Sequence, residues 1–443
     1  MSEIKNQNEF RGISNSRRVF ALLVLIVAGE SIFFLPFVLP RVFRPTILEV
    51  FELTNYELGT AFAAYGFVAI VAYALGGPLA DLFCPRKLLA IALVGTSLGG
   101  IVLWQVPSLG TLTWLYAFWG FTTIALFWAA LIRATRQWGG KLAQGSAFGL
   151  LEGGRGLLTA VTGSCVVAIY ASFLPADVES ASLEVRANAL KQVILILASI
   201  TFFAAVLIWI FLPKRNAIKP ADSSSWSLRG TWRVATMPVV WLQAFIIVCA
   251  YVGFKATDDF SLYAKDVLLL NEVEAARVGT YSLWMRPLAA IAAGFLADRF
   301  GSGKMTVVSF ALLTAGSAAL ASNFLTVSMF IPYIAMMVCA SLGIFALRGL
   351  YYAIMEEGQV PLAYTGSAVG LVSVIGYTPD IFMGPLMGYL LDTAPGVMGH
   401  RRVFMAVTIF SVAGLIASLA FIKFSPSKKQ NSTASVESSG DAP

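Results

Sequence analysis

The stretch Gly77-Pro-Leu-Ala-Asp81 recurs 217 positions later as Gly294-Phe-Leu-Ala-Asp298. Two further pairs keep the same order at offsets of 215 and 221 positions: Arg133 with Arg348, and residues 145–150 with residues 366–371. Three matches in one order at nearly one offset indicate an internal duplication rather than a chance similarity. We therefore expect a fold made of two similar halves.

The composition predicts that this duplicated chain lies in a membrane. Of its 443 residues, 58% are hydrophobic and only 12% are charged, with a mean hydropathy of +0.77. A soluble domain carries roughly a quarter of charged residues. Twelve membrane spans of about 20 apolar residues each need roughly 240 residues, which fit here with short loops between them. An ordinary soluble enzyme and a disordered chain are both excluded.

Twelve apolar runs predict an all-α membrane protein, because a single run of this length has to satisfy its own backbone hydrogen bonds. The expected transmembrane helices form two pseudo-symmetric six-helix halves. The runs lie near residues 19–40, 57–81, 87–104, 111–134, 144–170, 192–212, 236–261, 275–298, 305–323, 326–353, 362–390 and 403–423. The predicted organisation is an N-terminal segment (1–18), a first half (19–213), a linker (214–235), a second half (236–423) and a disordered tail (424–443).

The distribution of positive charge predicts that both termini face the cytoplasm. With the termini inside, the inner loops hold about 18 Lys and Arg residues and the outer loops about 8. Arg401 and Arg402 fall on the outer side, next to His400, which is expected to be solvated in a loop. The location expected from these features is the cell membrane, as a multi-pass protein of the bacterial inner membrane, whose first span is retained because it lacks a cleavage site.

Apart from the terminal residues of each run, ionisable residues occur inside seven of the runs and are absent from the third, sixth, ninth and twelfth. A charge that faces lipid is expensive, so these residues are expected to face a central cavity or one another. Every third span is then a lipid-facing support. The charged residues within the runs are Glu30, Arg133, Glu152, Arg155, Lys255, Asp258, Asp259, Arg286, Arg348 and Asp380.

Three carboxylates are candidates for proton coupling, because burial favours the neutral form of an acid. They are Glu30, Asp380 and Glu152. The alternative for Glu30 is a permanent ion pair with Arg155 or Lys255. Glu152 and Arg155 lie three residues apart on one helix face and are expected to neutralise each other. The intervening glycines favour tight packing against another span.

Basic and aromatic residues on the same spans are candidates for substrate binding. Two guanidiniums from opposite halves, those of Arg133 and Arg348, could clamp one carboxylate, sulfonate or phosphate. The alternative is pairing with nearby carboxylates or backbone carbonyls. The full set of expected substrate-binding residues is Arg133, Arg348, Arg286, Lys255, Tyr351 and Tyr377.

At the duplicated loops the chain resembles the major facilitator superfamily of secondary transporters. The second half keeps the family's loop motif, and the first half departs from it at Leu82 and at Cys84-Pro85. The resemblance implies a gate on the cytoplasmic side that holds the outward-open state. The residues that match the motif are Gly77, Asp81, Arg86, Lys87, Gly294, Asp298, Arg299 and Gly301, with Lys304 after them.

A weaker resemblance, between Phe127 and Gly156, is to bacterial permeases near the sugar-phosphate permeases, a branch that often handles organic anions. Phosphate-ester exchange is not implied, because the first span offers Glu30 where those antiporters place a basic residue. The expected function is alternating-access transport of a small organic solute, an anion by preference, coupled to protons. Proton-antiport efflux of drugs or metabolites and a transporter-like ligand sensor are the alternatives.

Several partners and chemistries are not expected. The sequence contains no nucleotide-binding loop, and its single His cannot form a catalytic triad at membrane depth. We therefore expect no enzyme activity, no cofactor, no metal and no nucleic-acid partner. The four cysteines show neither metal-ligand spacing nor a disulfide pattern. The expected partners are a small solute, protons and the lipid bilayer, with the protein as a monomer.

Overall fold

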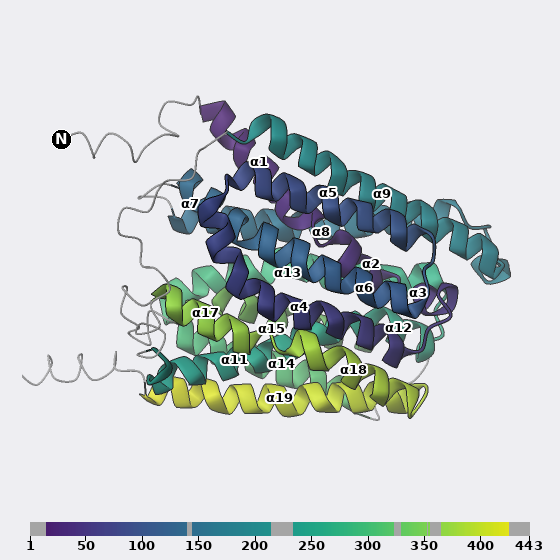
Figure 1. The fold of residues 1–443 in the computed structure, drawn as a ribbon. Helices are drawn as coiled ribbons and strands as arrows, with labels where there is room; N and C mark the ends of the chain where they lie inside the picture. The colour runs from purple at the N-terminus through teal and green to yellow at the C-terminus, as the bar shows by residue number, and fades with distance from the viewer. Residues whose placement is uncertain are drawn as a thin grey trace, which may run out of the picture.

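The computed structural model describes residues 15–139, 144–213, 234–322, 329–351, 353–354 and 365–424, and every regular element in this part is a helix. Most of these helices run side by side in one bundle (Figure 1). The first described helix, α1, starts at the same end of the bundle at which the last one, α19, finishes, and this end is here called the terminal end. The opposite end, where α3 and α12 lie, is called the far end.

The first half contains a broken helix followed by five further spans. The break falls between Ser31 and Phe34, near Pro36 and Pro40, which interrupt helical hydrogen bonding, and the two pieces meet at 41°. A capping box of Thr54 and Glu57 starts α4. The elements are α1 (Asn15–Ser31), η3 (Phe34–Val38), α2 (Leu39–Val42), α3 (Arg44–Val50), α4 (Asn55–Leu82), α5 (Pro85–Trp104), α6 (Leu109–Gly120), η4 (Phe121–Trp128), α7 (Ala129–Gly139), α8 (Gln144–Ser172), η5 (Val178–Ser180) and α9 (Leu183–Phe211).

The second half follows the same plan. A capping box of Asn271 and Glu274 starts α13, and Gly301 ends that helix with a φ of +94°, which favours glycine. The elements are α11 (Pro238–Ala256), η6 (Thr257–Asp259), α12 (Phe260–Asp266), α13 (Glu272–Phe300), α14 (Ser302–Ala321), α15 (Phe330–Leu350), α17 (Thr365–Gly376), α18 (Pro379–Asp392) and α19 (Val397–Phe424).

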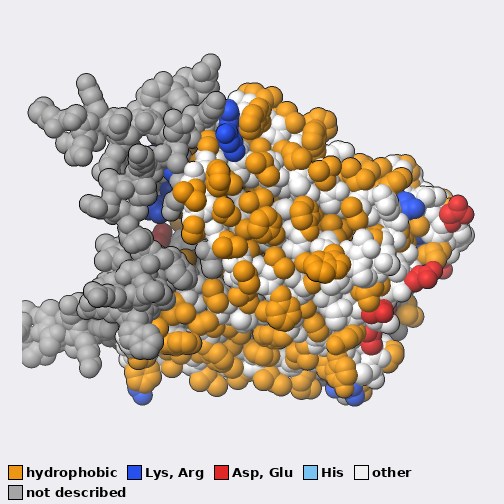
Figure 2. Space-filling view, viewed as in Figure 1, with side chains coloured by type: hydrophobic (Ala, Val, Ile, Leu, Met, Phe, Trp, Pro, Cys, Tyr) orange, Lys and Arg blue, Asp and Glu red, His pale blue; other side chains and the backbone are white. Residues whose placement is uncertain are grey.

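Ten spans in the described part are long and apolar enough to cross a membrane, or eleven if the bent pair before Val42 counts as one. The remaining member of the predicted twelve is α13, which has 29 residues and lies within the bundle but carries several charged side chains. Hydrophobic side chains cover the flank of the bundle in Figure 2, with charged side chains near its ends. The prediction of an all-α membrane protein is therefore confirmed.

The hydrophobic core is divided between the two halves. One cluster of buried residues comes from positions 234–421, and two others come mainly from positions 24–212. The halves meet where α4 packs against α18 and where α8 packs against α13. The predicted supports pair with each other instead, α5 with α9 and α14 with α19. The predicted linker lies almost entirely outside the described residues, as do most of the N-terminal segment and all but the first residue of the tail.

Glycine allows α4 and α18 to approach closely. A Cβ added at Gly66 would lie 2.6 Å from the carbonyl carbon of Asp380, and one added at Gly59 would lie 2.3 Å from the carbonyl oxygen of Gly384. Neither backbone can move away without separating the two helices. The contact between the halves therefore depends on the absence of side chains at these positions.

We expect Gly66→Val to destabilise this contact, because overpacking costs about 1–3 kcal/mol. The melting temperature of the purified protein in detergent should fall by several degrees. Gly149→Val is the matched control, since a Cβ at Gly149 meets no atom of the described chain within 4 Å. Equal melting temperatures for the two variants would contradict the proposed role of the close approach.

Candidate functional site

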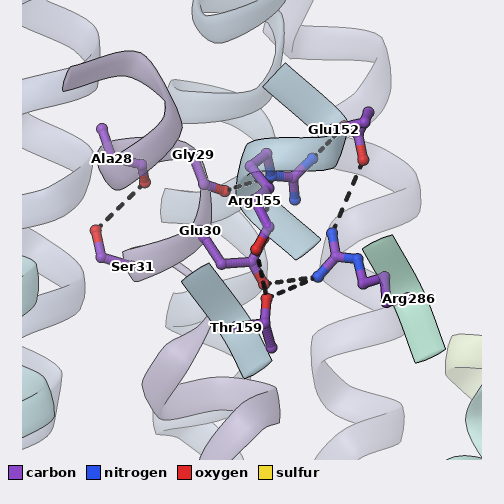
Figure 3. A network of polar contacts seen from close by, with 8 residues as sticks. All are labelled: Ala28, Gly29, Glu30, Ser31, Glu152, Arg155, Thr159 and Arg286. Atoms are coloured by element: carbon purple, nitrogen blue, oxygen red, sulfur yellow. Dashed lines mark hydrogen bonds and ion pairs between the residues drawn. The ribbon is translucent and has the colours of Figure 1, made fainter. Parts of the chain in front are cut away.

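The carboxylate of Glu30 lies where the two halves meet, and its side chain is buried. It comes from the last turn of α1 and is held from both sides (Figure 3). Arg155 of α8 donates from Nε to Oε2 at 3.1 Å, and Arg286 of α13 donates from Nη1 to Oε1 at 2.8 Å. Thr159 donates to Oε1 at 2.5 Å. One guanidinium from each half thus shares this carboxylate.

A second carboxylate, Glu152, completes this group. Arg155 donates to it from the same helix, so the intrahelical ion pair predicted from the spacing is present. Nη2 of Arg286 lies 3.8 Å from Oε2 of Glu152. The predicted tight packing against another span is present at Gly154, where an added Cβ would lie 2.7 Å from a side-chain carbon of Ile26 in α1. It is also present at Gly156, where an added Cβ would lie 3.2 Å from the backbone nitrogen of Pro287. Two acids and two bases therefore form one network across the interface, in which Glu30 and Arg155 are buried and Glu152 is exposed.

A second network of buried charges lies within the second half, around Lys255. Its Nζ is 3.4 Å from Asp380 and 3.6 Å from Asp258. The hydroxyl of Tyr251 donates to Asp380 at 3.1–3.2 Å. The ring of Phe37, from the first half, lies 4.9 Å from the same ammonium. The cation and its two acids are all less than a tenth exposed, so each depends on the others for charge compensation.

Two arginines from opposite halves lie over one aromatic ring. The guanidinium carbon of Arg348 is 3.9 Å from the ring centre of Phe254, and that of Arg41 is 4.6 Å from it. Arg41 also donates to Asp258 at 2.7 Å, while its Nη2 is buried and has no partner in the described part of the chain. Arg41 did not stand out in the sequence because it falls one residue beyond the predicted end of the first span.

The other expected substrate-binding residues have different surroundings. Arg133 donates to the carbonyl oxygen of Ala80, near the terminal end of α4. Tyr377 stacks on Tyr73 of the other half, with ring centres 5.6 Å apart. The carbonyl of Tyr351 accepts a hydrogen bond of 2.9 Å from an amide on α11. The clamp of Arg133 and Arg348 remains a prediction, and Arg41 is the first-half arginine that shares a ring with Arg348.

The residues of the gating motif lie at the terminal end. A Cβ added at Gly77 or at Gly294 would meet no atom of the described chain within 4 Å. Arg86 donates to the carbonyl of Trp209 at 3.3 Å, and Asp298 and Arg299 are exposed. Lys87 is exposed in the first turn of α5. The side chain of Asp81 lies outside the described residues.

Polar contacts join described residues of the two halves in the central network of Glu30 and Glu152 and again at the far end. At the far end Arg41 pairs with Asp258 at 2.7 Å, and Lys265 pairs with Glu49 at 2.5 Å. Further far-end contacts between described residues of the halves join Arg186 to Glu272, Asp392 to Asn55 and Tyr56, and Ser261 to the carbonyl of Arg41. The far end is therefore fastened by several contacts between the halves.

The expectation that His400 is solvated is wrong. Its side chain has no exposed surface, with Nδ1 2.8 Å from Asp259 and Nε2 3.3 Å from Asp266. The reason is that α19 begins at Val397, so His400 belongs to the first turn of a helix and faces α12 rather than water. In the described residues, no group of three or more His, Cys, Asp and Glu side chains is arranged to hold a metal ion.

A bundle of membrane-length helices in two groups, with ionised side chains buried where the groups meet, defines a polytopic membrane transport protein. Residues 19–377 match the Major Facilitator Superfamily, and the chain belongs to this superfamily of transporters. The resemblance seen in the sequence is thereby confirmed.

Relatives and solved structures agree with this assignment. Two Escherichia coli (strain K12) proteins are similar over nearly their whole length: inner membrane protein YqcE is 24% identical over 96% of this chain and 98% of its own, and inner membrane protein YihN is 25% identical over 91% and 95%. A variant of the nucleoside transporter NupG has a TM-score of 0.73 at 14% identity, covering 91% of this chain and 99% of its own. A bacterial homologue of the lysosomal transporter Spinster, inward-facing and unoccupied, has a TM-score of 0.69 at 17% identity over 93% and 98%. These likenesses in structure concern the fold alone.

Proposed function

We propose that this protein is a proton-coupled secondary transporter of a small organic anion that works by alternating access. The observation that carries the proposal is the position of Glu30, whose buried carboxylate is shared by Arg155 of one half and Arg286 of the other. A charge at this position changes the attraction between the halves when it gains or loses a proton.

The proposed coupling follows from the charges around Glu30. When Glu30 is ionised, it compensates both guanidiniums and holds α1, α8 and α13 together. A proton on Glu30 removes that compensation and leaves Glu152 as the acid in contact with both arginines. An organic anion can then replace the lost charge, so proton and anion favour each other's binding. Asp380, held by Lys255, is the second candidate for the proton-binding acid.

Preference for an anion is supported by the balance of charge at the centre of the bundle. Arg348 lies over the ring of Phe254 and forms no ion pair with another described residue, while Arg155 and Lys255 each contact a carboxylate. A guanidinium stacked on a ring keeps its edge free for bidentate binding of a carboxylate, sulfonate or phosphate. The aromatic rings nearby, including Tyr377 and its partner from the other half, offer a surface for the body of the solute.

The fastened far end supports an assignment of conformation. If both termini face the cytoplasm, as the positive charges predict, the far end is the outer side and the arrangement described here is inward-facing. The open surroundings of Gly77 and Gly294 fit this assignment, since the loop motif of the family is expected to close the inner side in the opposite state. The two Escherichia coli relatives are inner membrane proteins by name, which favours the inner membrane as the location of this protein.

A binding screen followed by a transport assay tests the proposal. A solute that binds the folded protein raises its melting temperature, by mass action. We expect organic anions to do so and uncharged sugars not to, and we expect the positive compounds to exchange across proteoliposomes in counterflow. Binding without counterflow would favour the ligand sensor. An imposed pH difference that drives loss of solute from the proton-poor side would favour proton-antiport efflux.

A further inference from the structure

His400 is the one histidine of the chain, and it lies buried at the far end between two carboxylates. Its Nδ1 is 2.8 Å from Oδ2 of Asp259, and its Nε2 is 3.3 Å from Oδ2 of Asp266. An ionised carboxylate only accepts hydrogen bonds, so each ring nitrogen has to donate a proton. The geometry therefore fits an imidazolium ion bridging two acids.

The turn held by His400 is also the turn that fastens the far end. The 3₁₀ segment η6 contains Asp258 and Asp259 next to each other. Asp259 faces His400 within the second half, and Asp258 receives Arg41 from the first half at 2.7 Å. Because Asp258 and Asp259 are consecutive residues, a shift of the backbone at Asp259 also shifts the carboxylate of Asp258.

We infer that doubly protonated His400 is a positioning residue, which holds η6 where Asp258 can receive Arg41 and so favours closure of the far end. Oδ1 of Asp259 is buried and has no hydrogen-bond partner among the described residues, so His400 is the described cation that hydrogen-bonds to this acid, while Arg44 of the first half attracts it without a hydrogen bond. Removing the positive charge leaves a buried carboxylate without a hydrogen-bonded cation, and movement of η6 toward water relieves that cost. The same motion draws Asp258 away from Arg41.

Other charged groups nearby do not replace the imidazolium. Arg401, on the same helix, donates instead to the carbonyl of Ala321 at 3.0 Å. Arg44 and Asn55 both belong to the first half, and Arg44 donates its hydrogen bonds to Asn55. Arg44 therefore attracts Asp259 only without a hydrogen bond. The charged and titratable groups around His400 are Asp259 of η6, Asp266 and Tyr263 of α12, Tyr333 of α15, Arg44 of α3 and Arg401 of α19.

The protonation state can be read directly. Protein labelled with ¹⁵N-histidine and purified with a tag that lacks histidine gives imidazole signals from His400 alone. At pH 7.5 a free histidine is mostly neutral. We expect the two nitrogens of His400 to show imidazolium shifts at this pH, and to lose them in Asp259→Asn. A neutral ring in the wild type would overturn the inference.

The effect on closure is measured by electron-electron resonance between spin labels at Ser180 and Thr393, exposed far-end positions in opposite halves, after the four native cysteines are replaced. His400→Gln should lower the ratio of closed to open protein at pH 7.5 by about tenfold or more, the loss expected for a charged hydrogen bond. His400→Lys, which keeps the charge, should restore much of it.

The adjacent acids provide a matched control. Asp258→Asn should open the far end and leave the imidazolium signal of His400 unchanged, whereas Asp259→Asn should alter both. A wild-type distance distribution in His400→Gln, or equal opening in the Gln and Lys variants, would overturn the inference. None of these measurements requires the solute, so their failure would leave the proposed transport function standing.

Discussion

Replacing Glu30 with glutamine should abolish uptake driven by a proton gradient and leave solute exchange in place. Glutamine keeps the shape of the side chain and can still accept from Thr159 and Arg286, but it cannot take up a proton. A driving force equivalent to 100 mV supplies about 2.3 kcal/mol per charge, which corresponds to roughly 50-fold accumulation. In the variant the accumulation ratio should fall to about one.

The measurement uses proteoliposomes with the solute identified by the binding screen, first under an imposed pH difference and then in counterflow without one. Glu184→Gln is the matched control, because it removes the same charge from an exposed acid in the first turn of α9. It should retain accumulation. If Glu30→Gln accumulates solute normally and Asp380→Asn does not, the proton-binding acid belongs to the Lys255 network and our assignment to Glu30 is wrong.

Much of the architecture could be predicted from the sequence, because the membrane leaves few alternatives. Apolar runs of span length have to be helices, and the duplicated motifs set the order of the two halves. Of the predicted spans, α13 alone is not apolar enough to be recognised as a membrane helix by its composition, and its charged residues include Arg286 of the central network. The same arginine therefore lowers the hydropathy of α13 and gives this helix its contact with Glu30.

Contacts within one helix could also be predicted, since the spacing of Glu152 and Arg155 places them on one face. Contacts between distant spans could not. Glu30 and Arg286 are 256 positions apart, and Arg41 and Asp258 are 217 apart. The pairing of charged side chains from different spans depends on how each helix is rotated about its axis and placed along the membrane normal. A run of apolar residues determines neither.

The errors at the ends of the spans have one cause. His400 and Arg41 both lie within a few residues of a predicted boundary, and the sequence predicts a loop position for His400 and gives no role to Arg41. The structure extends helices α2 and α19 over them, and each side chain is buried against an acid of η6 or its neighbours. Hydropathy alone places such a residue in water, because it counts the charge and not the partner that compensates it.

Replacing Arg348 with alanine should weaken binding of the anion by roughly 10- to 100-fold, the loss expected when a charge-assisted hydrogen-bond pair is removed. Its guanidinium lies over Phe254 and has no ion pair with a described residue, so an incoming anion displaces no partner among the described residues. Arg348→Lys keeps the charge but loses the bidentate geometry and should bind with intermediate affinity.

The same titration on Arg133→Ala separates the two arginines that the duplication pairs. Arg133 already donates to the carbonyl of Ala80 at the terminal end, so its loss should reduce transport more than binding. Calorimetric Kd values for both variants, with melting temperatures to verify folding, decide between the sites. If Arg133→Ala and Arg348→Ala lose the same affinity, both arginines bind the anion, as the sequence predicts. In that case the clamp has to form in a conformation other than the one described here. A loss confined to Arg133→Ala would place the anion near Ala80 and exclude the ring of Phe254 as its binding surface.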